Sequence, residues 1–374
     1  MKVILEGSQA IAQTIQNCKP DVVSAYPITP QTHIVEGLAQ MKADGADFEY
    51  IRAESEFAAI SIVEGAAMAG VRTYTASSSQ GLLLMTEVLY NVAGSRLPIV
   101  LTCANRSVSA PINIWNDQQD AVTMRDSGWL MWFGETNQEV CDLHILAYKV
   151  AEQLSLPVMV NLDGFVLTHT VEPVEIETSE KIAKFLPAYT PIDYLDVKNP
   201  KSFGSLAFPE DYFEIRKDLH DDVVASAKVM AQEMSKFKTI FGRKLSMVEY
   251  YGDKRASTVI VAMGSVVGTI KDAIDELGSK SGVGVLKVVS LRPFPDAEIK
   301  KLLTGAKNIA VLDKSISLGT EGILATEIRR VIGDNKKIIS FVAGLGGRDI
   351  TKDSINGIYK TAKTTKEKVV FVDK

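Results

Sequence analysis

Short apolar segments alternate with helical segments along this chain, and this alternation is what most limits the folds open to it. In the first half, strand-like runs lie at 21–25, 48–52, 72–76, 97–102 and 157–161. Helical patterns separate them at 9–17, 31–42, 55–70, 82–92 and 138–154, with Ser8 and Ser55 as expected N-caps. Short, fully apolar strands joined by helices are typical of a parallel sheet covered on both faces. The sequence therefore predicts an α/β fold with a mostly parallel, doubly wound sheet.

The same alternation returns in the second half, after an interval with little strand signal. Between Glu172 and Ser257 the strand pattern lapses, and a helix is expected over about 211–241. Strand-like runs return at 258–265, 283–289, 309–312, 338–342 and 369–372. A chain of 374 residues is also too long for one ordinary core. We therefore expect a first domain at 1–240, which includes the helical connection, and a smaller α/β domain at 255–374.

The run Tyr26-Pro27-Ile28-Thr29-Pro30 follows the first of these strands. Proline fixes its own φ and pushes the residue before it out of the helical region, so Thr29 should lie on a stiff, extended corner. Ligands of α/β proteins bind at the carboxyl ends of the strands, where this hydroxyl is placed. A strand-to-helix turn without a ligand is the alternative interpretation.

The charge and hydropathy of the chain exclude several classes of partner. Its net charge is −5, and positive and negative residues are interspersed without a basic tract, which disfavours nucleic acid and anionic lipid. No segment reaches the ~18 unbroken apolar residues of a membrane span. The apolar run at the start is too short for a signal peptide, so a cytoplasmic location is expected.

Cysteine and histidine are few and scattered. The three cysteines, Cys18, Cys103 and Cys141, are far apart in apolar surroundings, which predicts buried thiols and neither a disulfide framework nor a metal motif. The four histidines are expected to form no cluster: His33, His144, His169 and His220. Of these, only His169 follows a strand end closely, so it is the one histidine considered as a possible site residue. No metal site is predicted in this chain.

Several motifs together resemble those of the 2-oxoacid:ferredoxin oxidoreductases. They lie at 26–30, 54–59 with 65–70, 75–82, 104–106 with 110–115, 162–165 with 168–169, and 290–295. The resemblance runs in order over nearly the whole chain, and it is to the α subunit of the multi-subunit pyruvate-type enzymes. It implies a pyrimidine-binding-type domain of the thiamine enzymes, followed by a domain like the C-terminal domain of transketolase.

The resemblance also implies roles for particular residues. Glu56 aligns with the family's thiamine glutamate, which hydrogen-bonds the aminopyrimidine ring. From the residues alone the choice stays open, because Glu54 and Glu64 are similar in type and an acidic residue at a helix start needs no function. Arg106 resembles the residue that binds the 2-oxoacid carboxylate, which a guanidinium can grip bidentately. A surface salt bridge is its alternative role.

The other implied site residues lie close to these in the sequence. Thr29 would donate a hydrogen bond to the carboxylate or carbonyl oxygen of the substrate. Pro27 and Ile28 would contact the cofactor, and Asn113 would bind or enclose the substrate, with plain packing as its alternative.

The implied cofactor is thiamine pyrophosphate, shared with a partner chain. Asp163-Gly164 lacks the longer Gly-Asp-Gly signature of diphosphate binding, so the diphosphate and its Mg²⁺ are expected on the partner. Three dispersed cysteines cannot ligate the family's 4Fe-4S clusters, which are therefore also expected on partner subunits. The partners implied are a thiamine pyrophosphate-binding β subunit, a ferredoxin-like cluster subunit and a γ subunit.

The function implied is oxidative decarboxylation of pyruvate with CoA to acetyl-CoA, CO2 and reduced ferredoxin, within a hetero-oligomer of anaerobic metabolism. A branched-chain or other 2-oxoacid enzyme of the family is the alternative. A 2-oxoglutarate enzyme is less expected, because 107–115 looks like the pyruvate-type form. A non-catalytic assembly subunit is a further alternative, which the presence of Thr29, Glu56 and Arg106 together disfavours.

Overall fold

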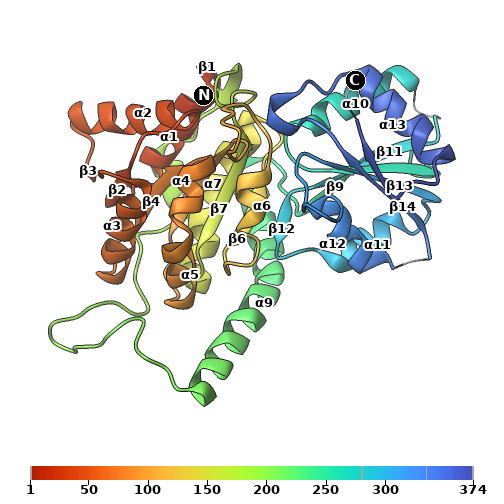
Figure 1. Cartoon of the computed structure of the whole chain (residues 1–374). Helices are drawn as coiled ribbons and strands as arrows, with labels where there is room; N and C mark the ends of the chain where they lie inside the picture. The colour runs from red at the N-terminus through yellow and green to blue at the C-terminus, as the bar shows by residue number, and fades with distance from the viewer. Residues whose placement is uncertain (1, 279–280, 334, 373–374) are drawn as a thin grey trace.

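Two largely parallel sheets lie side by side in the computed structural model, which describes residues 2–278, 281–333 and 335–372 (Figure 1). The first sheet has seven strands in the order β12-β6-β7-β5-β4-β2-β3. Their bounds are β2 (Val22–Ala25), β3 (Glu49–Arg52), β4 (Thr73–Ser77), β5 (Val100–Asn105), β6 (Leu130–Phe133), β7 (Val158–Asp163) and β12 (Ser290–Arg292). Only β12 among these strands runs antiparallel to its neighbour, β6. The predicted fold class is confirmed.

Helices cover both faces of this sheet. They are α1 (Gly7–Asn17), α2 (Thr32–Ala43), α3 (Glu56–Met68), α4 (Ser79–Leu84), α5 (Thr86–Gly94), α6 (Gln119–Thr123) and α7 (Asn137–Leu154). The Ser55 hydroxyl accepts a hydrogen bond from Ala58 N–H at 3.2 Å, so its predicted N-cap is confirmed. The N-cap predicted at Ser8 is wrong, because α1 begins before it and its hydroxyl donates to the Thr168 carbonyl instead.

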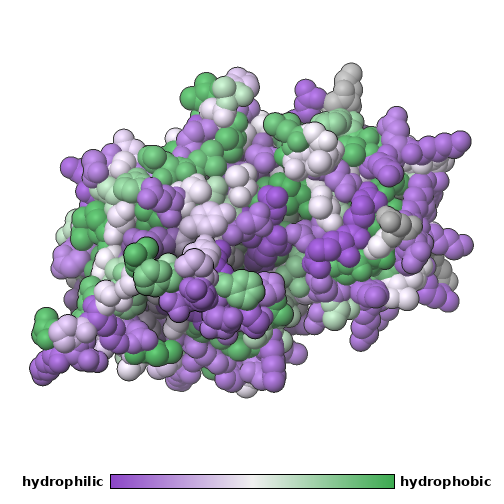
Figure 2. All heavy atoms as spheres, turned by 60° about the horizontal axis from the view of Figure 1, so that its bottom comes forward, coloured by the Kyte–Doolittle hydropathy of each residue, from purple (hydrophilic) through white to green (hydrophobic). Residues whose placement is uncertain are grey.

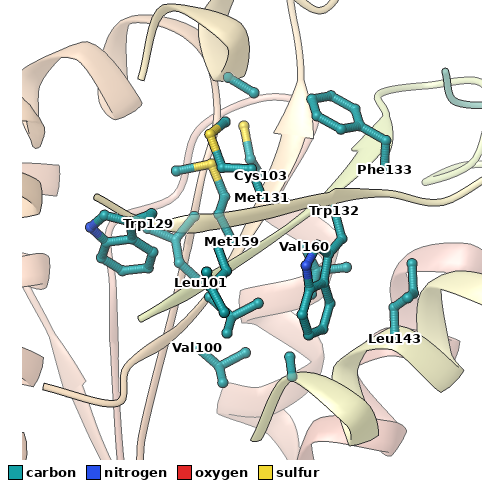
Figure 3. Packing of buried hydrophobic residues seen from close by; sticks show 14 of the residues in the cluster. Val100, Leu101, Cys103, Trp129, Met131, Trp132, Phe133, Leu143, Met159 and Val160 are labelled. Atoms are coloured by element: carbon teal, nitrogen blue, oxygen red, sulfur yellow. The ribbon is translucent and has the colours of Figure 1, made fainter. Parts of the chain in front are cut away.

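The core of the first sheet is built from its central strands. Every residue of β5, β6 and β7 is buried. Figure 3 shows Trp129, Trp132 and Met159 packed among aliphatic side chains of these strands and of α7. This apolar centre explains the short, continuous apolar strands, because both faces of each strand are covered.

The second sheet has six strands in the order β15-β14-β13-β10-β11-β9. They are β9 (Val248–Gly252), β10 (Thr258–Ala262), β11 (Val283–Val288), β13 (Asn308–Asp313), β14 (Lys337–Val342) and β15 (Val369–Phe371), and only β9 is antiparallel to its neighbour among them. Its helices are α10 (Val266–Leu277), α11 (Asp296–Leu303), α12 (Ile323–Ile332) and α13 (Lys352–Thr364), with the 3-10 turn η1 (Leu345–Gly347).

Between the two sheets, the predicted lapse of strands from 172 to 257 is wrong in two places. Strand β8 (Val171–Glu175) pairs antiparallel with the N-terminal β1 (Lys2–Glu6), and β9 joins the second sheet. Both are partly exposed strands, so they lack the continuous apolar run of a central strand. The predicted long helix is present as α9 (Pro209–Phe241), after a short α8 (Ser179–Ala183).

A segment ahead of α9 projects from the body with no helix or strand of its own. This segment spans residues 187–208. Together with the first turns of α9, as far as Ile215, it is called the arm here, and Figure 1 shows the arm at the lower left and lower centre. Its most exposed apolar side chains are Ile192 (72%), Val197 (94%), Leu206 (89%), Phe208 (66%) and Phe213 (67%). Figure 2 brings this side of the molecule forward and shows hydrophobic atoms among hydrophilic ones. None of the described helices is both long and apolar enough to cross a membrane.

Candidate active site

The carboxyl ends of four neighbouring strands gather the residues singled out in the sequence. Thr29 follows β2, Glu56 follows β3, and Arg106 follows β5 directly, while β4 lies between β5 and β2. Because these strands are parallel and adjacent, their carboxyl ends share one edge of the sheet. This is the edge at which open α/β sheets bind ligands.

Arg106 is buried at this edge, near the charge of Asp120 but without an ion pair to any described residue. Its side chain is 7% exposed, Nε donates to the Asn113 carbonyl at 3.1 Å, and Nη1 donates to the Thr29 carbonyl at 3.0 Å. Among residues 2–278, 281–333 and 335–372 no carboxylate forms an ion pair with it, so the alternative salt bridge is absent from the described chain. A guanidinium has five N–H donors, which leaves donors for an anionic ligand.

Thr29 presents its side chain to solvent on the loop that Arg106 holds. The residue is exposed, and its hydroxyl has no hydrogen-bond partner in the part of the chain that the structure describes. Gln31 fixes the loop from behind, since its Nε2 donates to the Ala76 carbonyl at 2.7 Å and its Oε1 accepts from Ile28 N–H at 3.4 Å. Pro27 is exposed and Ile28 half-buried. The Thr29 hydroxyl is therefore free to bind a ligand.

Asp120 connects the strand ends and is a residue that the sequence analysis missed. Its Oδ2 accepts hydrogen bonds from the backbone N–H groups of Ser79 and Arg106, both at 2.9 Å. Burial raises the pKa of this carboxyl to about 6, against the lowering effect of these hydrogen bonds. Asp120 thus holds the loops after β4 and β5 in register, a positioning role that local sequence does not reveal.

Glu56 begins α3 and carries a carboxylate without a partner. The residue is 7% exposed, and its carboxylate makes no hydrogen bond or ion pair with the described residues. The buried Ser77 hydroxyl also lacks a partner. A Cβ added at Gly81 would fall 2.5 Å from Glu56 Oε1 and 2.7 Å from Ser77 Oγ. A side chain larger than that of glycine would therefore clash here, because Glu56 and Ser77 pack closely against the backbone of Gly81.

The three glutamates that look alike in the sequence have different surroundings. Glu54 is exposed, whereas Glu56 and Glu64 are buried. Glu64 lies two turns further along α3, and its Oε1 is buried without a partner. Burial raises the pKa of Glu64 to about 7. Only Glu56 is both buried and close to the carboxyl end of a strand.

Asn113 uses its side chain to hold a loop. Its Nδ2 donates to the Gly346 carbonyl at 3.1 Å, and its Oδ1 accepts from Trp115 N–H at 2.7 Å and from the Ser107 hydroxyl at 2.8 Å. The amide thereby ties the loop after β5 to η1 of the second sheet. Direct contact between Asn113 and a substrate stays a prediction.

Asp163, at the end of β7, joins the two sheets behind this loop. Its Oδ2 accepts from Ser265 N–H at 2.9 Å and lies 3.2 Å from Lys314 Nζ. Burial opposes ionisation of Asp163, but Lys314 and the hydrogen bonds from Ser265 outweigh it and lower the pKa. The candidate site therefore rests against a buried polar contact with the second sheet.

The prediction that the histidines lie apart is wrong for two of them. The rings of His33 and His169 are 4.7 Å apart between centroids, and His33 Nδ1 is 2.7 Å from Glu6 Oε1. His144 is in the core, where burial lowers its pKa to about 4. All three cysteines are buried, as predicted.

A large cavity lies away from this site. It has a volume of about 790 Å³ and lies between α9 and the pair α11–α12. Two of its arginines are already paired, Arg292 with Glu327 and Arg330 with Asp296, each at 2.7 Å. The unpartnered polar groups at the strand ends are therefore the stronger candidate for chemistry.

The sequence matches two family descriptions in succession. Residues 13–235 match the thiamine diphosphate-binding domain of pyruvate flavodoxin/ferredoxin oxidoreductase, and residues 256–355 match core domain II of pyruvate:ferredoxin oxidoreductase. The chain belongs to the pyruvate:ferredoxin oxidoreductase family. The first match supports thiamine diphosphate as the cofactor of this family's N-terminal domain.

Curated relatives match over almost the whole chain. The pyruvate synthase subunit PorA of Methanocaldococcus jannaschii is 49% identical over 95% of this chain and 93% of its own length. PorA of Methanosarcina barkeri is 45% identical over 99% of this chain and 95% of its own length. The ketoisovalerate oxidoreductase subunit VorA of Pyrococcus horikoshii is 41% identical over 98% of this chain and 95% of its own length. These are subunits of oxidoreductases, which confirms the predicted family and the prediction of an enzyme subunit in a multi-subunit complex.

Solved structures share the fold. A 2-oxoglutarate:ferredoxin oxidoreductase from Magnetococcus marinus superposes with a TM-score of 0.74 at 19% identity. That match covers 97% of this chain, which spans only 65% of the solved chain. A split-gene transketolase superposes with a TM-score of 0.57 at 10% identity over 97% of this chain and 99% of its own. At these identities the likeness concerns the fold, and it includes the transketolase-like arrangement that the resemblance implied.

Proposed function

We propose that this chain is the α subunit of a pyruvate:ferredoxin oxidoreductase that forms acetyl-CoA, CO2 and reduced ferredoxin from pyruvate and CoA. The observation that carries the proposal is the set of unsatisfied groups at one sheet edge: the Glu56 carboxylate, the Thr29 hydroxyl and the unpaired charge of Arg106. The relatives named pyruvate synthase subunits, at 45% and 49% identity, support pyruvate as the substrate.

The surroundings of Glu56 fit the aminopyrimidine ring of thiamine diphosphate. The buried Glu56 carboxylate and the buried Ser77 hydroxyl, both without a partner among the described residues, are what a ring with its own donors and acceptors would satisfy. Glu56 would hold a proton at a ring nitrogen, and the exposed Pro27 with Ile28 would line the same edge. When bound, thiamine diphosphate supplies the nucleophilic carbon and the electron sink for decarboxylation.

Arg106 and Thr29 would orient the substrate. The guanidinium keeps its position through the Thr29 and Asn113 carbonyls, and its remaining donors would bind the carboxylate of a 2-oxoacid. The Thr29 hydroxyl would donate to a second oxygen of the same substrate. Asn113 would act on the substrate through the loop it holds, because both ends of its amide are already bonded.

A partner chain would complete the site. We assign Mg²⁺ and the diphosphate to a thiamine pyrophosphate-binding β subunit, and the 4Fe-4S clusters to a ferredoxin-like subunit, with a γ subunit as a further partner. The three cysteines are buried and apart, which supports the assignment of clusters elsewhere. Ferredoxin and CoA are reactants of the cytoplasm, where we place the complex.

Exposed apolar side chains beside Glu56 support such a partner. Phe57, Leu84 and Tyr90 are 41%, 50% and 40% exposed on α3, α4 and α5. The arm passes the far end of α3, where Leu195 N–H donates to the Met68 carbonyl at 2.7 Å. Exposed apolar side chains therefore lie both on the helices near the cofactor edge and on the arm. Exposed patches of this kind mark protein–protein interfaces.

A branched-chain 2-oxoacid enzyme is the second candidate, because VorA of Pyrococcus horikoshii is 41% identical to this chain. Pockets that differ by one methylene discriminate by only ~1–3 kcal/mol. A non-catalytic assembly role is disfavoured by the three unsatisfied groups at the sheet edge.

Purification of the native complex tests the proposal. The co-purifying chains are identified by mass spectrometry, and ferredoxin reduction is measured with CoA and either pyruvate or 2-oxoisovalerate. We expect cysteine-rich partner chains and at least tenfold higher kcat/KM for pyruvate. A preference for 2-oxoisovalerate would favour the second candidate, and no 2-oxoacid-dependent reduction would refute both.

A further inference from the structure

A cluster of three ligand-type side chains lies outside the roles assigned above. Glu6 ends β1, His33 lies in the first turn of α2, and His169 follows β7. One ligand atom from each side chain lies within 4.8 Å of the others, and Glu6 and His33 are partly buried. Segments distant in the sequence thus converge on one point beside the loop that carries Thr29.

Backbone hydrogen bonds hold two of the three segments together, and side chains join the third. Gly7 N–H donates to the Thr170 carbonyl at 3.1 Å and Ser8 N–H to the Thr168 carbonyl at 3.0 Å, which fixes Glu6 beside His169. The two imidazole rings are in tilted contact, 4.7 Å between centroids. The cluster is therefore a property of the fold and not of flexible surface side chains meeting by chance.

Thr168 orients His169 in the way that metal-ligating histidines are usually oriented. Its hydroxyl oxygen is 2.7 Å from His169 Nδ1 and accepts from Phe165 N–H at 2.8 Å. When Nδ1 carries the proton and donates to this hydroxyl, Nε2 keeps a lone pair for a metal.

We propose that Glu6, His33 and His169 bind a divalent transition-metal ion of the zinc class. Two imidazole nitrogens and one carboxylate form a common three-ligand set for Zn²⁺, with a fourth position left for water. Mg²⁺ and Ca²⁺ prefer oxygen ligands, so the two imidazoles argue against them. The side chains of His33 and Glu6 are 43% and 27% exposed, which gives an ion access from solvent.

The ion would replace the hydrogen bond between His33 and Glu6. His33 Nδ1 and Glu6 Oε1 are 2.7 Å apart, and a metal bound by both would need this proton to leave. Bound metal would tie the start of α1, the start of α2 and the segment after β7 to one centre. Because α2 follows the loop of Thr29, the site would stabilise the conformation of that loop.

Zinc titration of the purified full-length chain tests this site. The chain, stripped of metal by a chelator and freed of any affinity tag, is titrated with Zn²⁺ in competition with a chromophoric chelator. We expect one Zn²⁺ per chain with a dissociation constant below about 1 μM, and no competition from excess Mg²⁺. The buried cysteines leave little background from thiols.

Substitutions locate the bound ion. His33→Gln and His169→Gln should each weaken Zn²⁺ binding at least ~10- to 100-fold, as loss of even a supporting partner does at metal sites. His220→Gln, on an exposed face of α9, should bind Zn²⁺ as the unmodified chain does. His33 is exposed enough for its variant to fold, which circular dichroism would verify. Absence of binding to the unmodified chain, or equal affinity in folded His33→Gln, would overturn the proposal, and neither result bears on oxoacid chemistry.

Discussion

Three glutamates around α3 differ in burial and in partners, and the same substitution should affect each one differently. Glu56→Gln keeps the shape of the side chain, but an amide cannot hold the proton that the carboxylate would share with a pyrimidine nitrogen. We expect activity of the reassembled complex to fall ~10²–10⁴-fold, the range of general acid–base assistance. Steady-state assays of Glu54→Gln provide the matched control, because Glu54 is exposed. Equal losses in the two variants would remove Glu56 from its role.

Glu64 should affect stability and not chemistry. Burial raises its pKa to about 7, above its ordinary value of 4.5. The folded chain therefore keeps a proton that the unfolded chain has released, so stability declines as pH rises through this interval. Glu64→Gln removes the buried charge, and its gain in melting temperature over the unmodified isolated chain should be larger at pH 8 than at pH 5. An equal shift at both pH values would contradict the raised pKa.

Arg106 combines a ligand role with support of its own loop. Arg106→Lys keeps the charge but loses the planar fork and the Nε bond to the Asn113 carbonyl. Loss of one charge-assisted contact costs ~1.5–3 kcal/mol, so kcat/KM for pyruvate should fall roughly ten- to a hundredfold. The control is Arg125→Lys, whose side chain donates to the Val122 carbonyl away from the strand ends. Kinetics unchanged in Arg106→Lys would exclude carboxylate binding.

At the scale of elements, local sequence predicts the central strands and long helices well. Strands such as β5 and β7 are buried on both faces, so a continuous apolar run identifies them. β12 has three residues and pairs across to the first sheet, a contact that no local pattern encodes. The single helix expected over 82–92 is in fact two helices, α4 and α5, which are separated at Met85. The prediction missed this break because the apolar pattern continues through it.

The arm carries apolar side chains that the rest of the described chain leaves exposed. Leu206 and Phe208 are 89% and 66% exposed, so Leu206→Ser with Phe208→Ser removes little core packing. We expect the doubly substituted chain to keep its melting temperature but to bind its partner chain at least tenfold more weakly. Leu318→Ser, 88% exposed on the other half of the molecule, is the matched control. Unchanged association in analytical ultracentrifugation would exclude the arm from the interface.

At the scale of the whole molecule, the candidate site depends on contacts between distant segments. Motifs in the sequence indicated Thr29, Glu56 and Arg106, and the strand order places them along one sheet edge. The sequence did not indicate Asp120, which bonds backbone groups from two other loops, or the Glu6–His33–His169 cluster. Such groups become recognisable only when the fold brings their partners together, because their own neighbours in sequence carry no periodic or spacing signal.

The chain as a whole would supply the pyrimidine half of a thiamine diphosphate site. Within residues 2–278, 281–333 and 335–372, the only group of three metal-ligand side chains includes neither Glu56 nor any other residue assigned to that site. Asp163-Gly164 also lacks the longer Gly-Asp-Gly signature of diphosphate binding. Affinity for the intact cofactor should then depend on a second chain.

Isothermal titration calorimetry with thiamine diphosphate and Mg²⁺ tests this claim most directly. The cofactor is titrated into the isolated chain, into the isolated β subunit, and into their stoichiometric mixture. We predict no saturable binding to the isolated chain below about 1 mM, and one cofactor per pair of chains with micromolar or tighter affinity in the mixture. Loss of affinity for the mixture with Glu56→Gln would place the ring on this chain. Micromolar binding to the isolated chain would contradict the shared site.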